Sequence, residues 1–170
     1  KIRAIYKEVS GGEKKEDWMP FQVVCDECGK IGTTKVHSFD GKSVSYTCEP
    51  NLVKWAQGCS HKGEKNPFDG GGKFPYKVEW AAKWKVLGVT IEGAGKDHSS
   101  KGGSRDISNR IASEVFGITP PLNVPYEHFL LEGKKMSSSK GLGVTAREMS
   151  ELIPPYLLRF LMSRYKPKTA

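Results

Sequence analysis

All four cysteines of the chain lie between residues 25 and 59, and this cluster constrains the fold more than any other feature. Cys25 and Cys28 form a C-x-x-C pair followed by Gly29, a spacing that lets both thiolates face one cation. The start of the sequence has no apolar signal-like segment, so we expect metal ligands rather than disulfides. With Cys48 and Cys59 as the other ligands, the sequence predicts a tetrahedral structural zinc site.

The segment between the cysteines carries a hairpin signal. Asp40-Gly41 separates two β-prone runs, residues 33–38 and 43–48, which predicts a turn that sets position 33 opposite Cys48. His61 could replace Cys48 or Cys59 as a ligand, and buried free cysteines or disulfides remain alternatives. His37 is more typical of a surface residue. Such a module can bind nucleic acid or can hold a small insertion together, and its few basic residues favour the second role.

The pattern of the rest of the chain predicts an α/β protein. Residues 1–20 are expected to begin within a strand and continue as a linker, and residues 62–72 read as a polar linker. Apolar spacing and turn residues predict the remaining elements. They are a strand at 21–24, a helix at 80–87 before Gly88, a strand at 89–92, a helix at 104–116, a strand at 126–131, a capped helix at 145–152, and a helix from Pro154-Pro155 whose buried face is Leu157, Leu158, Phe160 and Leu161.

Two loops carry candidate ligand-binding residues. The strand at 89–92 leads into a glycine-rich tip, and in parallel α/β sheets ligands bind at such strand ends. Asp97 could hold ribose hydroxyls and His98 a polar substrate, although an Asx turn with an exposed histidine is the plainer interpretation. Residues 132–141 form a basic, serine-rich loop whose ammonium, hydroxyl and amide groups suit phosphate oxygens. The net charge of +8 favours an anionic partner.

The order of residues in this loop is more specific than its composition. Lys135-Met136-Ser137-Ser138-Ser139 resembles the KMSKS signature of class I aminoacyl-tRNA synthetases, and Lys140-Gly141 fits its continuation. Together with the run from Gly95 to Asp106 and the Glu114–Gly117 stretch, it is similar to the archaeal-type class I lysyl-tRNA synthetases over residues 73–167. The cysteines stand where these enzymes carry a zinc-binding insertion.

This resemblance implies a fold: the C-terminal half of a Rossmann-like class I nucleotide-binding domain with an inserted zinc-ribbon-like module. The implied division is a strand and linker at 1–24, the zinc module at 25–65, the Rossmann-like half at 66–150 and the start of a helical region at 151–170. The implied activity is ATP-dependent formation of lysyl-adenylate and transfer of lysine to tRNA(Lys). A cytoplasmic location follows, and the absence of an 18-residue apolar run predicts no membrane span.

The resemblance also assigns residues. Lys135, Ser137, Ser139 and Lys140 would contact the ATP phosphates and stabilise charge on the departing pyrophosphate, with Mg²⁺ accompanying the ATP. Met136 belongs to the same nucleotide loop, and Gly95 and Asp97 would hold the ribose. The amino-acid pocket would contain Tyr76, His98 and Tyr126, because aromatic rings attract an ammonium group.

Two departures from the family pattern affect these expectations. Ser138 stands where the signature has its second lysine, although Lys140 could supply that charge. The sequence contains no His-x-Gly-His, so we expect an excised piece that lacks the HIGH half of the site and does not activate lysine alone. Two alternatives remain: another class I enzyme of the glutamyl type, and a zinc-ribbon RNA-binding module without catalysis.

Overall fold

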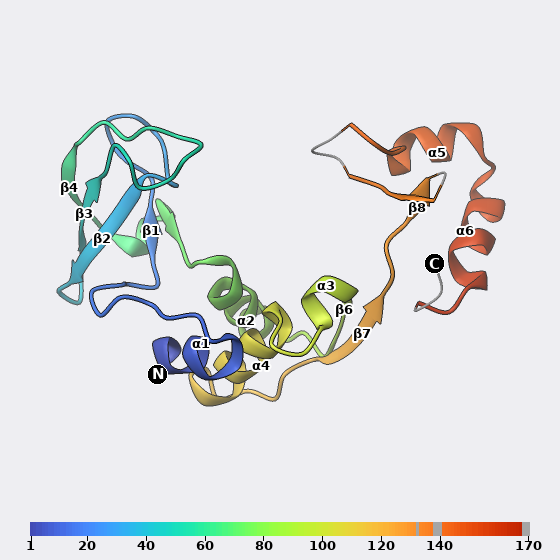
Figure 1. Cartoon of the computed structure of the whole chain (residues 1–170), viewed down its shortest axis with the longest axis horizontal. Helices are drawn as coiled ribbons and strands as arrows, with labels where there is room; N and C mark the ends of the chain where they lie inside the picture. Colours follow the sequence, from blue (N-terminus) through green and yellow to red (C-terminus); the bar gives the residue numbers. More distant parts are fainter. Residues whose placement is uncertain (132, 138–140, 168–170) are drawn as a thin grey trace.

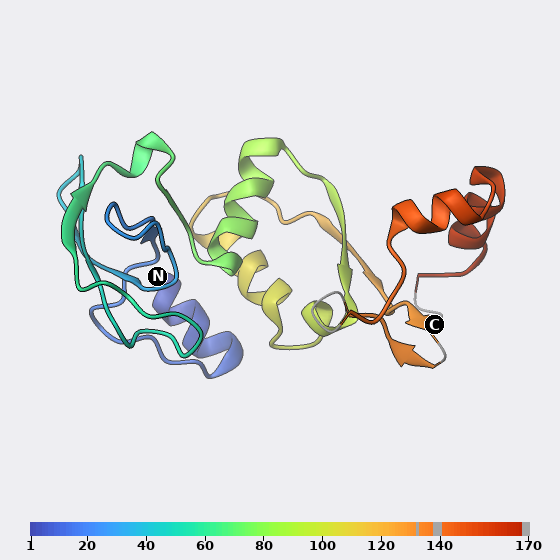
Figure 2. The same ribbon diagram turned by 90° about the horizontal axis from the view of Figure 1, so that it is seen from above.

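The computed structural model describes residues 1–131, 133–137 and 141–167, and it is a mixed α/β structure. Its elements gather in three groups along one direction (Figures 1 and 2). A small β-ribbon lies at one end, helices with a parallel strand pair lie in the middle, and a hairpin with two helices lies at the other end. Within these residues, no helix is both long and apolar enough to cross a bilayer.

The ribbon is a three-stranded antiparallel sheet in the order β2 (Thr34–Phe39), β3 (Val44–Cys48), β4 (Lys62–Lys65). Beside it, β1 (Gln22–Val23) pairs with β5 (Gly72–Lys73), and the 3₁₀ turn η1 (Pro67–Asp69) precedes β5. Alternate residues of β3, the last of them Cys48, point into a common core that also contains Val23, Val36 and Cys25. The predicted strand at 21–24 is confirmed, whereas the linker predicted at 62–72 is wrong, since it contributes β4, η1 and β5.

The predicted hairpin is present, but its register differs by one residue. Asp40 accepts hydrogen bonds from the amides of Lys42 and Ser43, so the turn spans residues 40–43 instead of two residues. This longer turn shifts the strand pairing by two residues relative to a two-residue turn. A bulge at position 37 then reduces the shift to one residue. Cys48 therefore lies opposite Thr34, and not opposite Thr33.

The N-terminal segment is a helix, α1 (Ile2–Ser10), so the strand expected there is wrong. Ile2, Ile5 and Val9 follow 3–4 spacing, and Ile5 is buried in the helical core beside Tyr6. Gly11 ends the helix in the left-handed conformation, with φ 66°, and its amide bonds to the Lys7 carbonyl. The charged residues between the apolar ones made this apolar helix face hard to recognise in the sequence.

The helical core is formed by α1 with α2 (Tyr76–Leu87) and α4 (Ser104–Glu114). Its buried side chains are Ile5, Tyr6, Val78, Ala81, Trp84, Ile107, Ile111 and Ala112. The helix predicted at 80–87 is confirmed, with its end at Gly88, and begins four residues earlier. The helix predicted at 104–116 is also confirmed and ends two residues earlier, at Glu114.

A parallel pair of strands, β6 (Ile91–Gly95) and β7 (Leu122–Tyr126), lies beside this core. Their register joins Ile91 to Leu122 and Gly95 to Tyr126, so both strands end at one edge, where α3 (Lys96–Ser99) begins. The single strand predicted at 126–131 is confirmed only at its ends, because β7 ends at Tyr126 and β8 covers only residues 130–131. Pro125 within β7 made this strand hard to recognise, since proline is tolerated only where the ladder does not need its amide.

The third group contains the hairpin of β8 (Leu130–Leu131) and β9 (Lys134–Lys135) with α5 (Ala146–Leu152) and α6 (Pro155–Arg164). Thr145 and Glu148 form the predicted capping box at the start of α5. The predicted buried face of α6 is wrong for three of its four residues, since Leu157, Phe160 and Leu161 are 43%, 55% and 43% exposed, whereas Leu158 is half-buried. Among the described residues, none of those in α6 belongs to a buried core cluster, so its apolar spacing does not produce burial.

Candidate active site and metal centre

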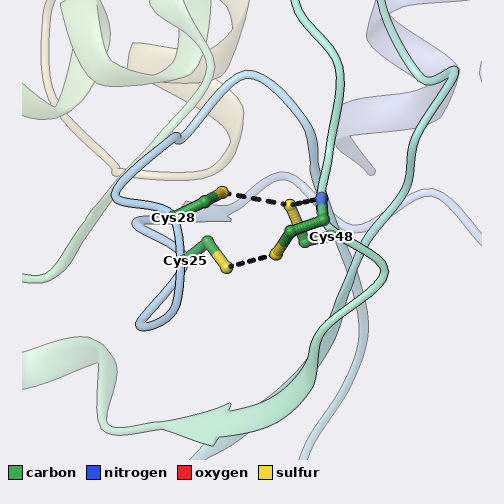
Figure 3. Close-up of side chains that lie close together, drawn as sticks. Cys25, Cys28 and Cys48 are labelled. Carbon is green, nitrogen blue, oxygen red and sulfur yellow. Dashed lines mark hydrogen bonds between the residues drawn. The ribbon is translucent and has the colours of Figure 1, made fainter.

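The four cysteine sulfurs lie within 4.8 Å of one another. The Sγ atoms of Cys25 and Cys59 are 3.6 Å apart, and those of Cys28 and Cys48 are 3.7 Å apart (Figure 3). In a tetrahedral thiolate site with Zn–S bonds of about 2.3 Å, neighbouring sulfurs lie about 3.8 Å apart. The donor set therefore fits a zinc ion of the structural kind.

Local contacts prepare these sulfurs for a cation. The Thr33 hydroxyl lies 3.2 Å from the Cys48 sulfur, and the Cys59 amide donates to the same atom over 3.3 Å. Burial opposes ionisation of Cys48, but these hydrogen bonds outweigh it and lower the pKa of the thiol to about 7. The thiolate form, which binds metal, is therefore favoured at this position.

Side chains of the β-ribbon contact the knuckle between Cys25 and Cys28 through Asp26. The Asp26 carboxylate accepts hydrogen bonds from the Tyr46 hydroxyl and the Lys65 ammonium, and the Asp26 amide donates back to the Tyr46 oxygen. Among the described residues the metal-ligating cluster consists of the four cysteines, and His61 lies outside it beside Tyr46. His37 is exposed and bonds to Thr47, as expected of a surface residue.

Gly58 allows the chain to bring Cys59 to this cluster. A Cβ atom at Gly58 would lie 2.3 Å from the Glu49 carbonyl oxygen and 2.9 Å from that of Cys48, both backbone atoms. We therefore expect Gly58→Ala to destabilise the ribbon by about 1–3 kcal/mol. Gly12→Ala is a control, because its Cβ would meet only the Ser10 hydroxyl. Urea unfolding of both variants measures the difference, and equal midpoints would contradict the close packing at Gly58.

A second cluster lies where β6 and β7 end. Asp97, in α3, accepts a hydrogen bond from the Lys135 ammonium over 3.0 Å and lies 3.1 Å from Nε2 of His128. The sequence analysis missed His128 because it placed this residue inside a strand. Once β7 is known to end at Tyr126, parallel pairing puts the following residues at the same edge as Asp97. The structure thus joins the predicted ribose-binding tip to the predicted phosphate loop.

The charges around Asp97 shift its ionisation. The hydrogen bond from Lys135 and its positive charge, together with the contact to His128, hold the pKa of Asp97 below its usual range. The side chains of Asp97 and Lys135 are 58% and 54% exposed, so this pair contributes little stability and can separate easily.

This lowered pKa gives a pH prediction. A depressed carboxyl pKa means that the Asp97–Lys135 pair is present above the ordinary carboxyl range and is lost as pH falls through the lowered value. We expect Lys135→Ala to raise the pKa of Asp97, and Lys134→Ala to leave it unchanged, as measured by carboxyl ¹³C NMR titration. The same Asp97 titration in the parent and in Lys135→Ala would show that the contact is absent in solution.

Aromatic side chains form a wall beside the tip. Tyr76 stacks on Trp80 with ring centroids 5.4 Å apart, and His98 lies 5.9 Å from Tyr76 and 6.0 Å from Trp80. Trp80 was not among the predicted pocket residues, but its position four residues after Tyr76 places both rings on one helix face. The predicted pocket residues Tyr76 and His98 are thus brought together, with Trp80 as a third member.

Tyr126 lies at the end of β7, with its ring against Gly93 and Gly95, where added Cβ atoms would meet it at 3.3 and 3.8 Å. Burial raises the pKa of Tyr76, and the charges of Glu92 and Tyr126 raise it further.

The basic loop is partly described. The Ser137 amide donates to the Leu142 carbonyl over 2.6 Å, and the Leu142 amide donates back over 3.0 Å, which closes the loop. Met136 lines a cavity of about 980 Å³ with α5 and α6, and Gly143 leaves room for its side chain. Ser139 and Lys140, both predicted phosphate ligands, lie outside the described residues, as does Ser138.

Comparison with known proteins agrees with these features. The family model of class I (K) tRNA synthetases matches residues 1–170. The chain is 47% identical to lysine–tRNA ligase 1 of Methanosarcina acetivorans, and 44% identical to the lysine–tRNA ligases of Archaeoglobus fulgidus and Thermoplasma acidophilum. Each alignment covers 98% of this chain but only 30%, 32% and 31% of the respective relative. The resemblance found in the sequence is confirmed: the chain belongs to the class I (K) family of tRNA synthetases.

Proposed function

We propose that this chain supplies the phosphate loop and part of the amino-acid pocket of a lysine–tRNA ligase. The full reaction would form lysyl-adenylate from lysine and ATP and then transfer lysine to tRNA(Lys). The observation that carries the proposal is the hydrogen bond between Lys135 of the loop and Asp97 of the tip. This bond joins Asp97, assigned to the ribose of ATP, to Lys135, assigned to its phosphates, although the two residues are 38 positions apart in the sequence.

In this reaction the lysine carboxylate attacks the α-phosphorus of ATP, and pyrophosphate leaves. Asp97, with the Gly95 backbone, would hold the ribose, and Lys135 would move from Asp97 to the phosphates when ATP arrives. The exposed Asp97–Lys135 pair supports this exchange of partners, because it costs little to break. Lys135 and the hydroxyl of Ser137 would stabilise the charge on pyrophosphate, together with Mg²⁺, Ser139 and Lys140.

The wall of Tyr76, Trp80 and His98, with Tyr126 on the neighbouring strand, would form part of the lysine pocket. Rings that surround a cation attract it through their negative faces, which suits a lysine ammonium group. The net charge of +8 supports an anionic partner such as tRNA. A cytoplasmic location would follow from a role in protein synthesis.

The wider fold would be the second half of a Rossmann-like domain, spanning residues 66–150. The parallel pair β6–β7, with ligand groups at its carboxyl edge, supports this assignment. Residues 25–65 would be an inserted module in which Cys25, Cys28, Cys48 and Cys59 hold one structural zinc ion. Residues 1–24 would lead into this module, and residues 151–170 would begin a helical region.

Charging of tRNA tests the proposal. An intact enzyme that contains this chain is expected to attach labelled lysine, but not labelled glutamate, to tRNA transcripts. Glutamate attachment would indicate an enzyme of the glutamyl type. Binding of tRNA without attachment of either amino acid would favour a noncatalytic RNA-binding module and would contradict the proposal.

A further inference from the structure

One carboxylate oxygen near the start of β6 accepts three hydrogen bonds. Oε2 of Glu92 lies 2.8 Å from the indole nitrogen of Trp80, 2.5 Å from that of Trp84 and 3.2 Å from a guanidinium nitrogen of Arg105. Buried indole N–H groups need an acceptor, and here both use the same atom. Glu92 therefore fixes the directions of two neighbouring rings on α2.

Arg105 links this carboxylate to the neighbouring elements. Its side chain is 1% exposed, and its guanidinium lies 4.4 Å from the Trp84 ring centroid and 5.3 Å from that of Trp80. Its second terminal nitrogen donates over 2.8 Å to the carbonyl of Pro121, directly before β7. A buried guanidinium needs a counter-charge, and Glu92 supplies it. The Glu92–Arg105 pair thus joins α2, β6, α4 and the entry to β7.

These contacts act on the proposed lysine pocket through Trp80. Tyr76 stacks on Trp80 with an interplanar angle of 24°, and His98 meets Trp80 edge-on at 76°. A rotation of the Trp80 ring would therefore move the surfaces that Tyr76 and His98 present. Glu92 holds that ring through its indole N–H and also lies on the strand that leads to Asp97.

We propose that Glu92 is a positioning residue for lysine recognition, which orients the Tyr76–Trp80–His98 wall through its hydrogen bonds to the two indoles. This inference rests on the proposed function and extends it to residues that no ligand is expected to touch. The essential property is the reach of an acceptor oxygen to the indole nitrogens. The negative charge serves mainly to compensate Arg105.

Two conservative variants of Glu92 separate the position of its acceptor oxygen from the negative charge of its carboxylate. Glu92→Asp keeps the charge but withdraws the oxygen by one methylene, whereas Glu92→Gln keeps an oxygen at the same reach without the charge. The matched control is Glu114→Asp, since Glu114 pairs with Arg110 on the exposed side of α4. Lysine-dependent ATP–pyrophosphate exchange in an intact enzyme containing this chain gives KM for lysine and for ATP separately. Indole ¹H–¹⁵N spectra report whether Trp80 and Trp84 keep their hydrogen bonds.

We expect Glu92→Asp to raise KM for lysine about tenfold, because small misplacements of binding groups are costly. KM for ATP should stay within about twofold, and both indole signals should shift. Glu92→Gln should be less stable than the parent, because Arg105 loses its counter-charge, but the folded enzyme should retain most of the parental affinity for lysine. Glu114→Asp should match the parent. An unchanged KM for lysine in Glu92→Asp, or equal increases for lysine and ATP, would overturn the positioning role. Absence of lysine-dependent exchange in the parent would instead overturn the proposed function itself.

Discussion

Lys135→Ala is expected to lower the rate of lysine-dependent ATP–pyrophosphate exchange by about 10²–10³-fold, the usual loss when one charge-stabilising donor is removed. The structure places the Lys135 ammonium on Asp97, at the edge where the proposed nucleotide site lies. In the proposed reaction Lys135 would leave Asp97 and contact the phosphates. The loss should appear mainly in kcat, because the charge that Lys135 stabilises develops as pyrophosphate leaves.

Lys134→Ala is the matched control for this experiment. Lys134 is an exposed lysine of the same short strand, and its replacement removes the same charge from the loop. We expect it to change the exchange rate less than about threefold, as surface charges usually act weakly. Similar losses in both variants would indicate that the loop acts only through its net charge. A large loss of RNA affinity in Lys135→Ala with normal adenylate formation would contradict the nucleotide assignment.

Removal of metal is expected to have the largest effect on stability. Small zinc modules gain about 10–16 kcal/mol of apparent free energy from the ion, which is folding free energy. The ribbon core is small, and two of its six buried members are the cysteines Cys25 and Cys48. We therefore expect one equivalent of zinc per chain, and loss of the ribbon's amide dispersion in NMR spectra when a strong chelator removes it.

Cys48→Ser should reproduce this loss without a chelator, because Cys48 is fully buried and its sulfur accepts the Cys59 amide. Ser38→Ala is a suitable control on the same ribbon, since it removes one exposed hydroxyl and its bond to Ser45. The control should retain its zinc and its spectrum. A chain that contains no metal and keeps its full amide dispersion in chelator would contradict the zinc assignment.

The cluster of four cysteines could be predicted from the sequence because cysteine spacing and a hairpin signal are local features. The C-x-x-C-G knuckle could be recognised without any information on distant packing. The β2–β3 hairpin places Cys48 beside this knuckle even though the predicted register was wrong by one residue. That error came from the carboxylate of Asp40, which lengthened the turn, and from the bulge at position 37.

The second cluster could be predicted only in part, because it depends on strand ends. The glycine-rich tip indicated Asp97, and the loop pattern indicated Lys135, but their contact requires β7 to end at Tyr126. Pro125 concealed that strand, and His128 was missed with it. The three bonds to Glu92 could not be predicted for a similar reason, since they join residues of α2, β6 and α4 that only tertiary packing brings together.

The amino-acid dependence of ATP–pyrophosphate exchange is the decisive test of whether this chain belongs to an enzyme that activates lysine. The measurement uses an intact enzyme that contains this chain, labelled pyrophosphate, ATP, and either lysine or glutamate. We expect label to enter ATP when lysine is present, and glutamate to give only the background rate. Exchange driven by glutamate, or no exchange with either amino acid in a protein that still binds tRNA, would contradict it.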